Sequence, residues 1–141
     1  MLKTITQVSD SISATAKIAL EFAKSLENNC IIYLNGDVGS GKTIFTNKVA
    51  SYFGNHTITS SSFSRIQLHR GFPNIIHCDL YRGVFTSAQL LLELETHLVE
   101  PWLLFIEWPN ETLSIPNSCQ YVVNIDIISL GNRTFSFEQI I

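Results

Sequence analysis

A glycine-rich segment at residues 36–43 constrains this chain more than any other feature of its sequence. It reads Gly-Asp-Val-Gly-Ser-Gly-Lys-Thr and matches the pattern G-x-x-x-x-G-K-[ST]. A continuous apolar run at residues 30–34 comes directly before it, and residues 42–53 after it have the apolar spacing of a helix. Because a loop of this pattern requires a buried strand before it and a helix after it, the sequence predicts an α/β protein built around a strand–loop–helix unit.

The residue types in this segment are those that phosphate binding needs. Glycines let the backbone wrap closely and aim its N–H groups at an anion, and the N-terminus of the following helix adds positive potential. We expect Lys42 to reach the β- and γ-phosphates of a nucleotide and the Thr43 hydroxyl to bind Mg²⁺. A glycine-rich turn with an incidental lysine is the alternative, and the flanking elements disfavour it. The residues expected to contact the nucleotide here are Gly36, Asp37, Val38, Gly39, Ser40, Gly41, Lys42, Thr43 and Ile44.

Two acidic residues close apolar runs further along the chain. Asp79 follows residues 75–78, and Glu107 follows residues 102–106. Ligands of open α/β sheets lie beyond the carboxyl ends of the strands, so both carboxylates could face the phosphates and one could hold Mg²⁺. For either acid alone, a solvated residue just past a strand stays open. His77 lies within the first run, and we interpret it as a hydrogen-bonded core residue.

The order of the remaining elements indicates one domain over residues 1–141. A first helix is expected at residues 12–27, capped by Ser9-Asp10, and a further helix at residues 87–98. Further strands are expected at residues 66–68, 121–128 and 134–137, and a turn at residues 130–133 joins the last two. Strands and helices alternate early and strands alone follow late. The predicted fold is therefore a three-layer α/β P-loop NTPase fold, with a mostly parallel sheet and antiparallel C-terminal strands.

Composition excludes some classes of function. The formal net charge is -3, and no cluster of Lys and Arg is present, so direct gripping of nucleic acid by its phosphates is disfavoured. Apolar runs such as residues 102–106 are far shorter than the roughly 20 residues that span a bilayer, and the N-terminus has no apolar signal-peptide core. A cytoplasmic protein without membrane contact is expected. Its three cysteines, Cys30, Cys78 and Cys119, are expected to be buried and reduced.

Four segments together resemble the TsaE (formerly YjeE) family of P-loop ATPases, which acts in the bacterial biosynthesis of threonylcarbamoyladenosine in tRNA. They are the loop at residues 36–43, Ser-Ser-Ser-Phe at 60–63, His-Cys-Asp-Leu-Tyr-Arg at 77–82 and Ile-Glu-Trp-Pro at 106–109. Their order and spacing fit the family along nearly the whole chain. The family usually has proline where this chain has Ser61, which should loosen the segment 60–63.

The resemblance implies an activity, cofactors and partners. Members bind ATP and Mg²⁺, hydrolyse ATP slowly and dock on the pair formed by the TsaD transferase and its partner TsaB, so that tRNA is met only through the complex. Lys42 and the loop amides would hold phosphates, Thr43 and Glu107 would hold Mg²⁺, and Asp79 would be an essential acid that orients or activates water. Lys42, Asp79 and Glu107 are thus the expected catalytic residues.

Three nucleotide contacts are expected outside the loop, two from the resemblance and one from the residues themselves. Ser62 lies in the segment 60–63, which is expected to act as a switch near the γ-phosphate, and Trp108 belongs to the family pattern. Arg133 lies in a predicted turn, where an arginine is usually only solvated, but it is one of few arginines available to answer phosphate charge.

Three other functions use a phosphate-binding loop of this kind or the same pocket. A GTPase is disfavoured because the chain lacks N-K-x-D and D-x-x-G. A small-molecule kinase needs a lid with several arginines, whereas the arginines here are scattered and the chain is short. A nucleotide-gated adaptor that requires no hydrolysis needs the same pocket as the ATPase, so the sequence does not separate the two.

Overall fold

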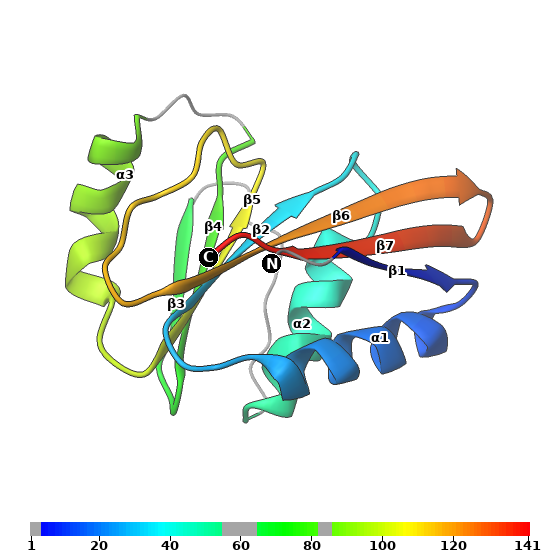
Figure 1. Ribbon diagram of the computed structural model, residues 1–141, viewed down its shortest axis with the longest axis horizontal. Coiled ribbons are helices and arrows are strands. Elements are labelled where there is room, and N and C mark those ends of the chain that lie inside the picture. Colours follow the sequence, from blue (N-terminus) through cyan, green and yellow to red (C-terminus); the bar gives the residue numbers. More distant parts are fainter. Residues whose placement is uncertain (1–3, 55–64, 82–85) are drawn as a thin grey trace.

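The computed structural model of the chain describes residues 4–54, 65–81 and 86–141. Within them, seven strands form one sheet in the order β1-β7-β6-β2-β5-β4-β3 (Figure 1). The elements are β1 (Thr4–Ser9), α1 (Ile12–Ser25), β2 (Cys30–Asn35), α2 (Lys42–Tyr52), β3 (Ile66–His69), β4 (Asn74–Asp79), α3 (Ser87–Leu94), the 3₁₀ helix η1 (Glu95–His97), β5 (Trp102–Glu107), β6 (Cys119–Ser129) and β7 (Asn132–Gln139).

The middle of the sheet is parallel and its edges are antiparallel. Strands β6, β2, β5 and β4 run in one direction. β7 runs antiparallel to β6 and β1, and β3 runs antiparallel to β4. The predicted mostly parallel core with antiparallel C-terminal strands is confirmed, and the two outermost strands, β1 and β3, are antiparallel as well.

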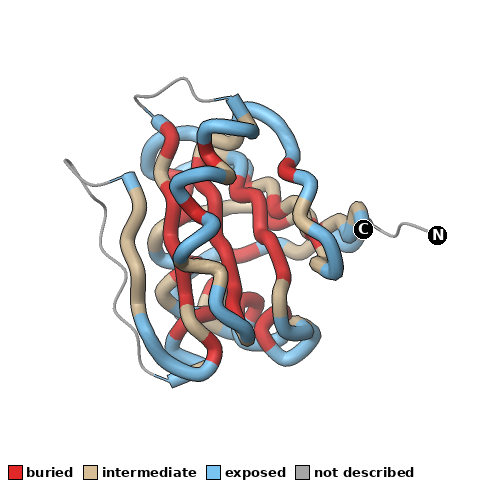
Figure 2. The backbone as a smooth tube through the Cα atoms, turned by 90° about the vertical axis from the view of Figure 1, so that its left-hand side faces the viewer, coloured by how far each residue is buried: buried red, intermediate tan, exposed pale blue. Residues whose placement is uncertain are grey.

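Helices cover both faces of the sheet, which gives the three layers that the sequence predicts. On one face, α1 and α2 pack on alternate residues of β2, namely Cys30, Ile32 and Leu34. On the other face of the sheet, α3 packs in the cluster that contains Ile31 and Tyr33 of β2. Because both faces of the central strands are covered, these strands read as continuous apolar runs and form the buried centre of the molecule (Figure 2). In the described part of the chain, no helix has the length and apolar character needed to cross a membrane.

The N-terminal region differs from the sequence prediction. Residues 4–9 form the edge strand β1, which was not predicted because its apolar residues Ile5 and Val8 are largely exposed and give no buried run. The expected Ser9-Asp10 cap is wrong: Ser11 caps α1, and its Oγ accepts a hydrogen bond from the Ala14 N–H at 3.0 Å.

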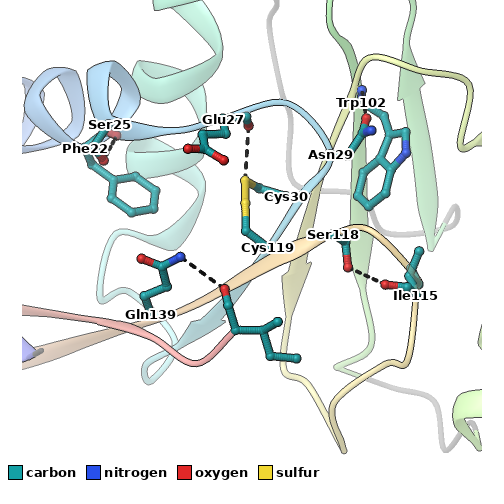
Figure 3. Close-up of a disulfide and its surroundings, with 11 residues drawn as sticks. Phe22, Ser25, Glu27, Asn29, Cys30, Trp102, Ile115, Ser118, Cys119 and Gln139 are labelled. Atoms are coloured by element: carbon teal, nitrogen blue, oxygen red, sulfur yellow. Dashed lines mark hydrogen bonds between the residues drawn. A yellow bond between two sulfur atoms is a disulfide. The ribbon is translucent and has the colours of Figure 1, made fainter. Parts of the chain in front are cut away.

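The prediction of three reduced cysteines is wrong for two of them. Cys30 and Cys119 are register partners at the start of β2 and β6, with Cα atoms 4.6 Å apart, and they form a disulfide (Figure 3). The two residues are 89 positions apart in the sequence, so their spacing alone gave no sign of the pairing. Cys78 is free and buried, as predicted.

The structure predicts that no thiol of the native, oxidised chain reacts with a thiol reagent. Burial, helped by the nearby Asp79 and Glu93 carboxylates, raises the pKa of Cys78 to about 12, so at pH 8 only about one Cys78 thiol in ten thousand is ionised. A colorimetric thiol assay at pH 8 should find no thiol in the native chain and one after denaturation without reductant. Denaturation after reduction should reveal all three cysteines. Rapid labelling of the native chain would contradict this assignment.

Candidate functional site

The glycine-rich loop, residues 36–43, joins the carboxyl end of the central strand β2 to the N-terminus of α2. Gly39 and Gly41 have positive φ values of 83° and 107°, in the left-handed region that glycine adopts most easily. Gly36 is needed for space: a Cβ there would lie 2.5 Å from the Ser40 Oγ and 2.8 Å from the Ile125 carbonyl oxygen. The loop is therefore wound tightly against the strand and leads directly into the helix.

Lys42 is a buried cation at the centre of the site. Its side chain is 5% exposed, and its ammonium donates hydrogen bonds to the carbonyl oxygens of Gly36 and of Asp37, the latter at 3.2 Å. The ammonium also lies 4.2 Å from the centroid of the Trp108 ring, a cation–π contact. Burial lowers the pKa of Lys42, and the negative charges of Glu107, Asp79 and Asp37 oppose that shift in this order.

The two predicted carboxylates lie next to each other. Asp79 ends β4, Glu107 ends β5, and the two residues are register partners in these parallel strands. The Asp79 Oδ1 accepts a hydrogen bond from the Tyr81 N–H at 3.0 Å, which orients this carboxylate. Both acids act electrostatically on Lys42, so the ends of two strands and the start of α2 converge there.

His77 is buried and hydrogen-bonded, as the sequence predicts, but the sequence does not identify its partner. The Nε2 of His77 pairs with the Oε2 of Glu107, and the two side chains are 1% and 6% exposed. His77 and Asp79 are two residues apart on one strand and so share a face of the sheet. The spacing of His77 and Asp79 therefore indicates that His77 faces the same side as the site. Only the pairing of β4 with β5 shows that Glu107 is its neighbour.

A pocket of about 380 Å³ forms where these elements meet, within the size range of small-ligand sites. It brings together nine of the predicted site residues, from three separate segments of the chain. Tyr81, whose ring centroid is 4.9 Å from that of Trp108, was not among the predicted residues. Val38 and Ile44 form part of its exposed rim. The pocket is lined by Val38, Gly39, Gly41, Lys42, Thr43, Ile44, Asp79, Tyr81, Glu107 and Trp108.

Other predicted residues lie outside this lining. Ser40 is 1% exposed, and its Oγ has no hydrogen-bond partner among the described residues. Arg133, at the start of β7, donates from Nε to the Ser40 carbonyl oxygen at 2.6 Å and from Nη2 to the Gly39 carbonyl oxygen at 3.1 Å. Arg133 thus contacts the carbonyl oxygens of the loop. Ser62, with the expected switch segment 60–63, lies outside the described residues.

A larger pocket, of about 660 Å³, lies between α1 and the strands β1, β6 and β7. Its floor is mostly apolar and includes Phe22, Tyr121 and Phe137, whose rings pack on one another. Among the described residues that line it, Glu21 is the one acidic side chain and no basic side chain is present. We place the functional site at the smaller pocket because the residues able to do chemistry converge there.

Fold and site together define the class: an α/β protein with a glycine-rich loop between a central parallel strand and a helix, faced by two acids on neighbouring strands. The family model described as "Threonylcarbamoyl adenosine biosynthesis protein TsaE" matches residues 9–135. The chain belongs to the TsaE family, and this family takes part in the biosynthesis of threonylcarbamoyladenosine in tRNA.

Individual relatives agree with this assignment, and one solved structure shares the fold. The chain is 37% identical to the tRNA threonylcarbamoyladenosine biosynthesis protein TsaE of Rickettsia conorii, with 90% of this chain and 74% of the relative covered. It is 31% identical to the protein of the same name from Rickettsia typhi, with 92% of each covered. The crystal structure of Bacillus subtilis YdiB superimposes with a TM-score of 0.75 at 24% identity, covering 99% of this chain and 88% of YdiB, and it supports the fold.

Proposed function

We propose that the chain binds ATP with Mg²⁺ in the pocket around Lys42, hydrolyses the ATP slowly, and thereby serves the complex that makes threonylcarbamoyladenosine in tRNA. One observation carries the proposal: Lys42 and Thr43 at the start of α2 share a single pocket with Asp79 and Glu107 at the ends of two neighbouring strands. A cation and an N-terminal helix end suit phosphates, and carboxylates on the opposite side suit a metal ion and a water molecule.

The phosphates would be held by the loop amides and by Lys42. The Lys42 ammonium already lies at the loop, where it donates hydrogen bonds to the carbonyl oxygens of Gly36 and Asp37. On nucleotide binding, the ammonium would exchange these carbonyls for phosphate oxygens, which are stronger partners because they are charged. The N-terminus of α2 would add its positive end to the same phosphates.

The residues present fit Mg²⁺. Mg²⁺ prefers oxygen ligands and is usually held by one or two protein groups together with phosphates and water. Thr43 and Glu107 supply a hydroxyl and a carboxylate to the pocket, and no larger cluster of His, Cys, Asp or Glu able to hold a metal occurs in the described part of the chain. When bound, Mg²⁺ supplies positive charge that neutralises the β- and γ-phosphates.

Asp79 would orient the attacking water. Its carboxylate is held at Oδ1 by the Tyr81 N–H and is half-buried, so it is both fixed and accessible from the pocket. A carboxylate in such a position accepts a hydrogen bond from water and aims the water oxygen at the γ-phosphate.

The partners follow from the family and remain part of the proposal. The chain would dock on the TsaD–TsaB pair, meet tRNA only within that complex, and act in the cytoplasm. ATP hydrolysis would then reset the assembly between rounds of tRNA modification.

The testing experiment is Mg²⁺-dependent ATP hydrolysis by the purified chain, alone and with the TsaD–TsaB pair. We expect slow turnover alone and faster turnover with the pair, both lost in EDTA. If ATP binds and the pair supports many rounds of tRNA modification without any hydrolysis, the chain is a nucleotide-gated adaptor. If phosphate is transferred to an added small molecule and not to water, the chain is a kinase.

Arg133 provides a separate prediction about the loop. Its two hydrogen bonds tie the Gly39 and Ser40 carbonyls of the loop to β7, so Arg133→Ala should loosen the loop and weaken ATP binding. Losing hydrogen bonds to a charged group costs about 1.5–3 kcal/mol, or roughly 10- to 150-fold in the Kd measured by calorimetry. Arg133→Lys should recover only part, because an ammonium lacks the guanidinium fork. Arg70→Ala, at an exposed site, is the matched control. An unchanged Kd for Arg133→Ala would contradict the role.

A further inference from the structure

The contact between His77 and Glu107 links the core of the sheet to the pocket. His77 lies on β4 opposite Phe105 of β5, and Glu107 is two residues beyond Phe105 on the same face. Phe105 packs in the cluster that α1 and α2 cover, so the pair lies on the face of the sheet that carries α2 and Lys42. His77 itself does not line the pocket, whereas Glu107 does.

Chemistry fixes the direction of the hydrogen bond. An ionised carboxylate, the form that would bind Mg²⁺, is only an acceptor, so the His77 Nε2–H donates a hydrogen bond to the Glu107 Oε2. A buried carboxylate without a donor is costly, and Glu107 is 4% exposed. The ring is as deeply buried as its partner, so solvent does not compete for this bond and the ring holds the carboxylate in one orientation.

We propose that His77 is a positioning residue for Mg²⁺ at Glu107, an inference that rests on the proposed function. By occupying Oε2, the His77 Nε2–H leaves the other oxygen of Glu107 as the one available to the metal. His77 acts through Glu107 and touches neither nucleotide nor metal. Outer partners that orient a metal-binding side chain change metal affinity by about 10- to 100-fold when they are removed.

The experiment measures metal affinity and not turnover. Mn²⁺ is titrated into the chain saturated with ADP, and free Mn²⁺ is followed by electron paramagnetic resonance. His77→Met removes the donor and keeps a side chain of similar bulk, and His77→Gln restores an N–H donor at a similar reach. Gln120→Met is the matched control, because Gln120 is also a buried hydrogen-bonding side chain on a strand, where it bonds to Leu113 and Tyr33.

We expect His77→Met to raise the Kd for Mn²⁺ by about 10- to 100-fold. His77→Gln should keep most of the affinity, Gln120→Met should keep all of it, and the affinity of each variant for ADP in EDTA should match that of the parent. Three results would overturn the proposal: unchanged Mn²⁺ affinity in folded His77→Met, equal loss in His77→Gln, or equal loss in Gln120→Met.

A second measurement on the parent chain covers the case in which His77→Met does not fold. Nitrogen NMR of the imidazole should show a protonated Nε2 that shifts when Mg²⁺ is added to the ADP complex. An unprotonated Nε2, or one that Mg²⁺ leaves unmoved, overturns the proposal. If the parent chain binds no ADP in EDTA, the proposed function itself is contradicted. If the parent binds ADP but its affinity for Mn²⁺ does not depend on His77, only the positioning role of His77 is contradicted.

Discussion

We expect Lys42→Met to weaken ATP binding strongly while leaving the fold intact. Lys42 is buried beneath the pocket, and methionine keeps its apolar stem and its packing against Trp108 while removing the charge. Truncating one partner of a buried charge pair costs about 2–5 kcal/mol, or roughly 30-fold to several-thousand-fold in the Kd for ATP. Isothermal calorimetry measures that loss.

The fold of Lys42→Met should survive because the parent structure gains little from this cation. Burial lowers the pKa of Lys42, which shows that the folded chain disfavours its charged form. Lys48→Met is the matched control, since Lys48 is exposed on the same helix and should bind ATP like the parent. Parent-like ATP affinity in Lys42→Met would remove the phosphate-binding role of the loop.

Asp79→Asn separates turnover from binding. Asparagine keeps the Oδ1 acceptor for the Tyr81 N–H, so the end of β4 should stay in place, but the amide is a poor partner for an attacking water. We expect the hydrolysis rate to fall by about 10²- to 10⁴-fold, the usual contribution of a general base, with the Kd for ATP little changed.

Single-turnover hydrolysis in the presence of the TsaD–TsaB pair measures this rate. Asp126→Asn, at an exposed position on β6, controls for the loss of one negative charge. If Asp79→Asn weakens ATP binding as much as it slows hydrolysis, Asp79 helps to hold the nucleotide or its metal, and another group must orient the water.

The sequence predicts the parts of this fold that depend on neighbouring residues. Local signals predict the apolar run of β2, the glycines after it and the helical spacing of α2. The predicted ends of β2 and α2 lie within a residue or two of the observed ends. Asp79 and Glu107 could be predicted at the same edge of the sheet because each closes an apolar strand and parallel strands end together.

The features that the sequence does not predict depend on residues far apart in the chain. The Cys30–Cys119 disulfide follows from the register of β2 with β6. The contact of Arg133 with the Ser40 carbonyl joins residues 93 positions apart. Edge strand β1 packs few of its side chains, so it lacks the pattern of a buried strand. In each case the information lies in which distant segments come together, which the periodicity of the sequence does not supply.

The disulfide has a topological consequence. It closes a covalent ring from Cys30 to Cys119, and the ring contains the glycine-rich loop, Asp79 and Glu107. A single proteolytic nick anywhere inside the ring opens it without releasing a fragment. The nicked chain would therefore migrate as one species on a non-reducing gel and as two on a reducing gel, with both halves of the site still tethered at the far end of β2.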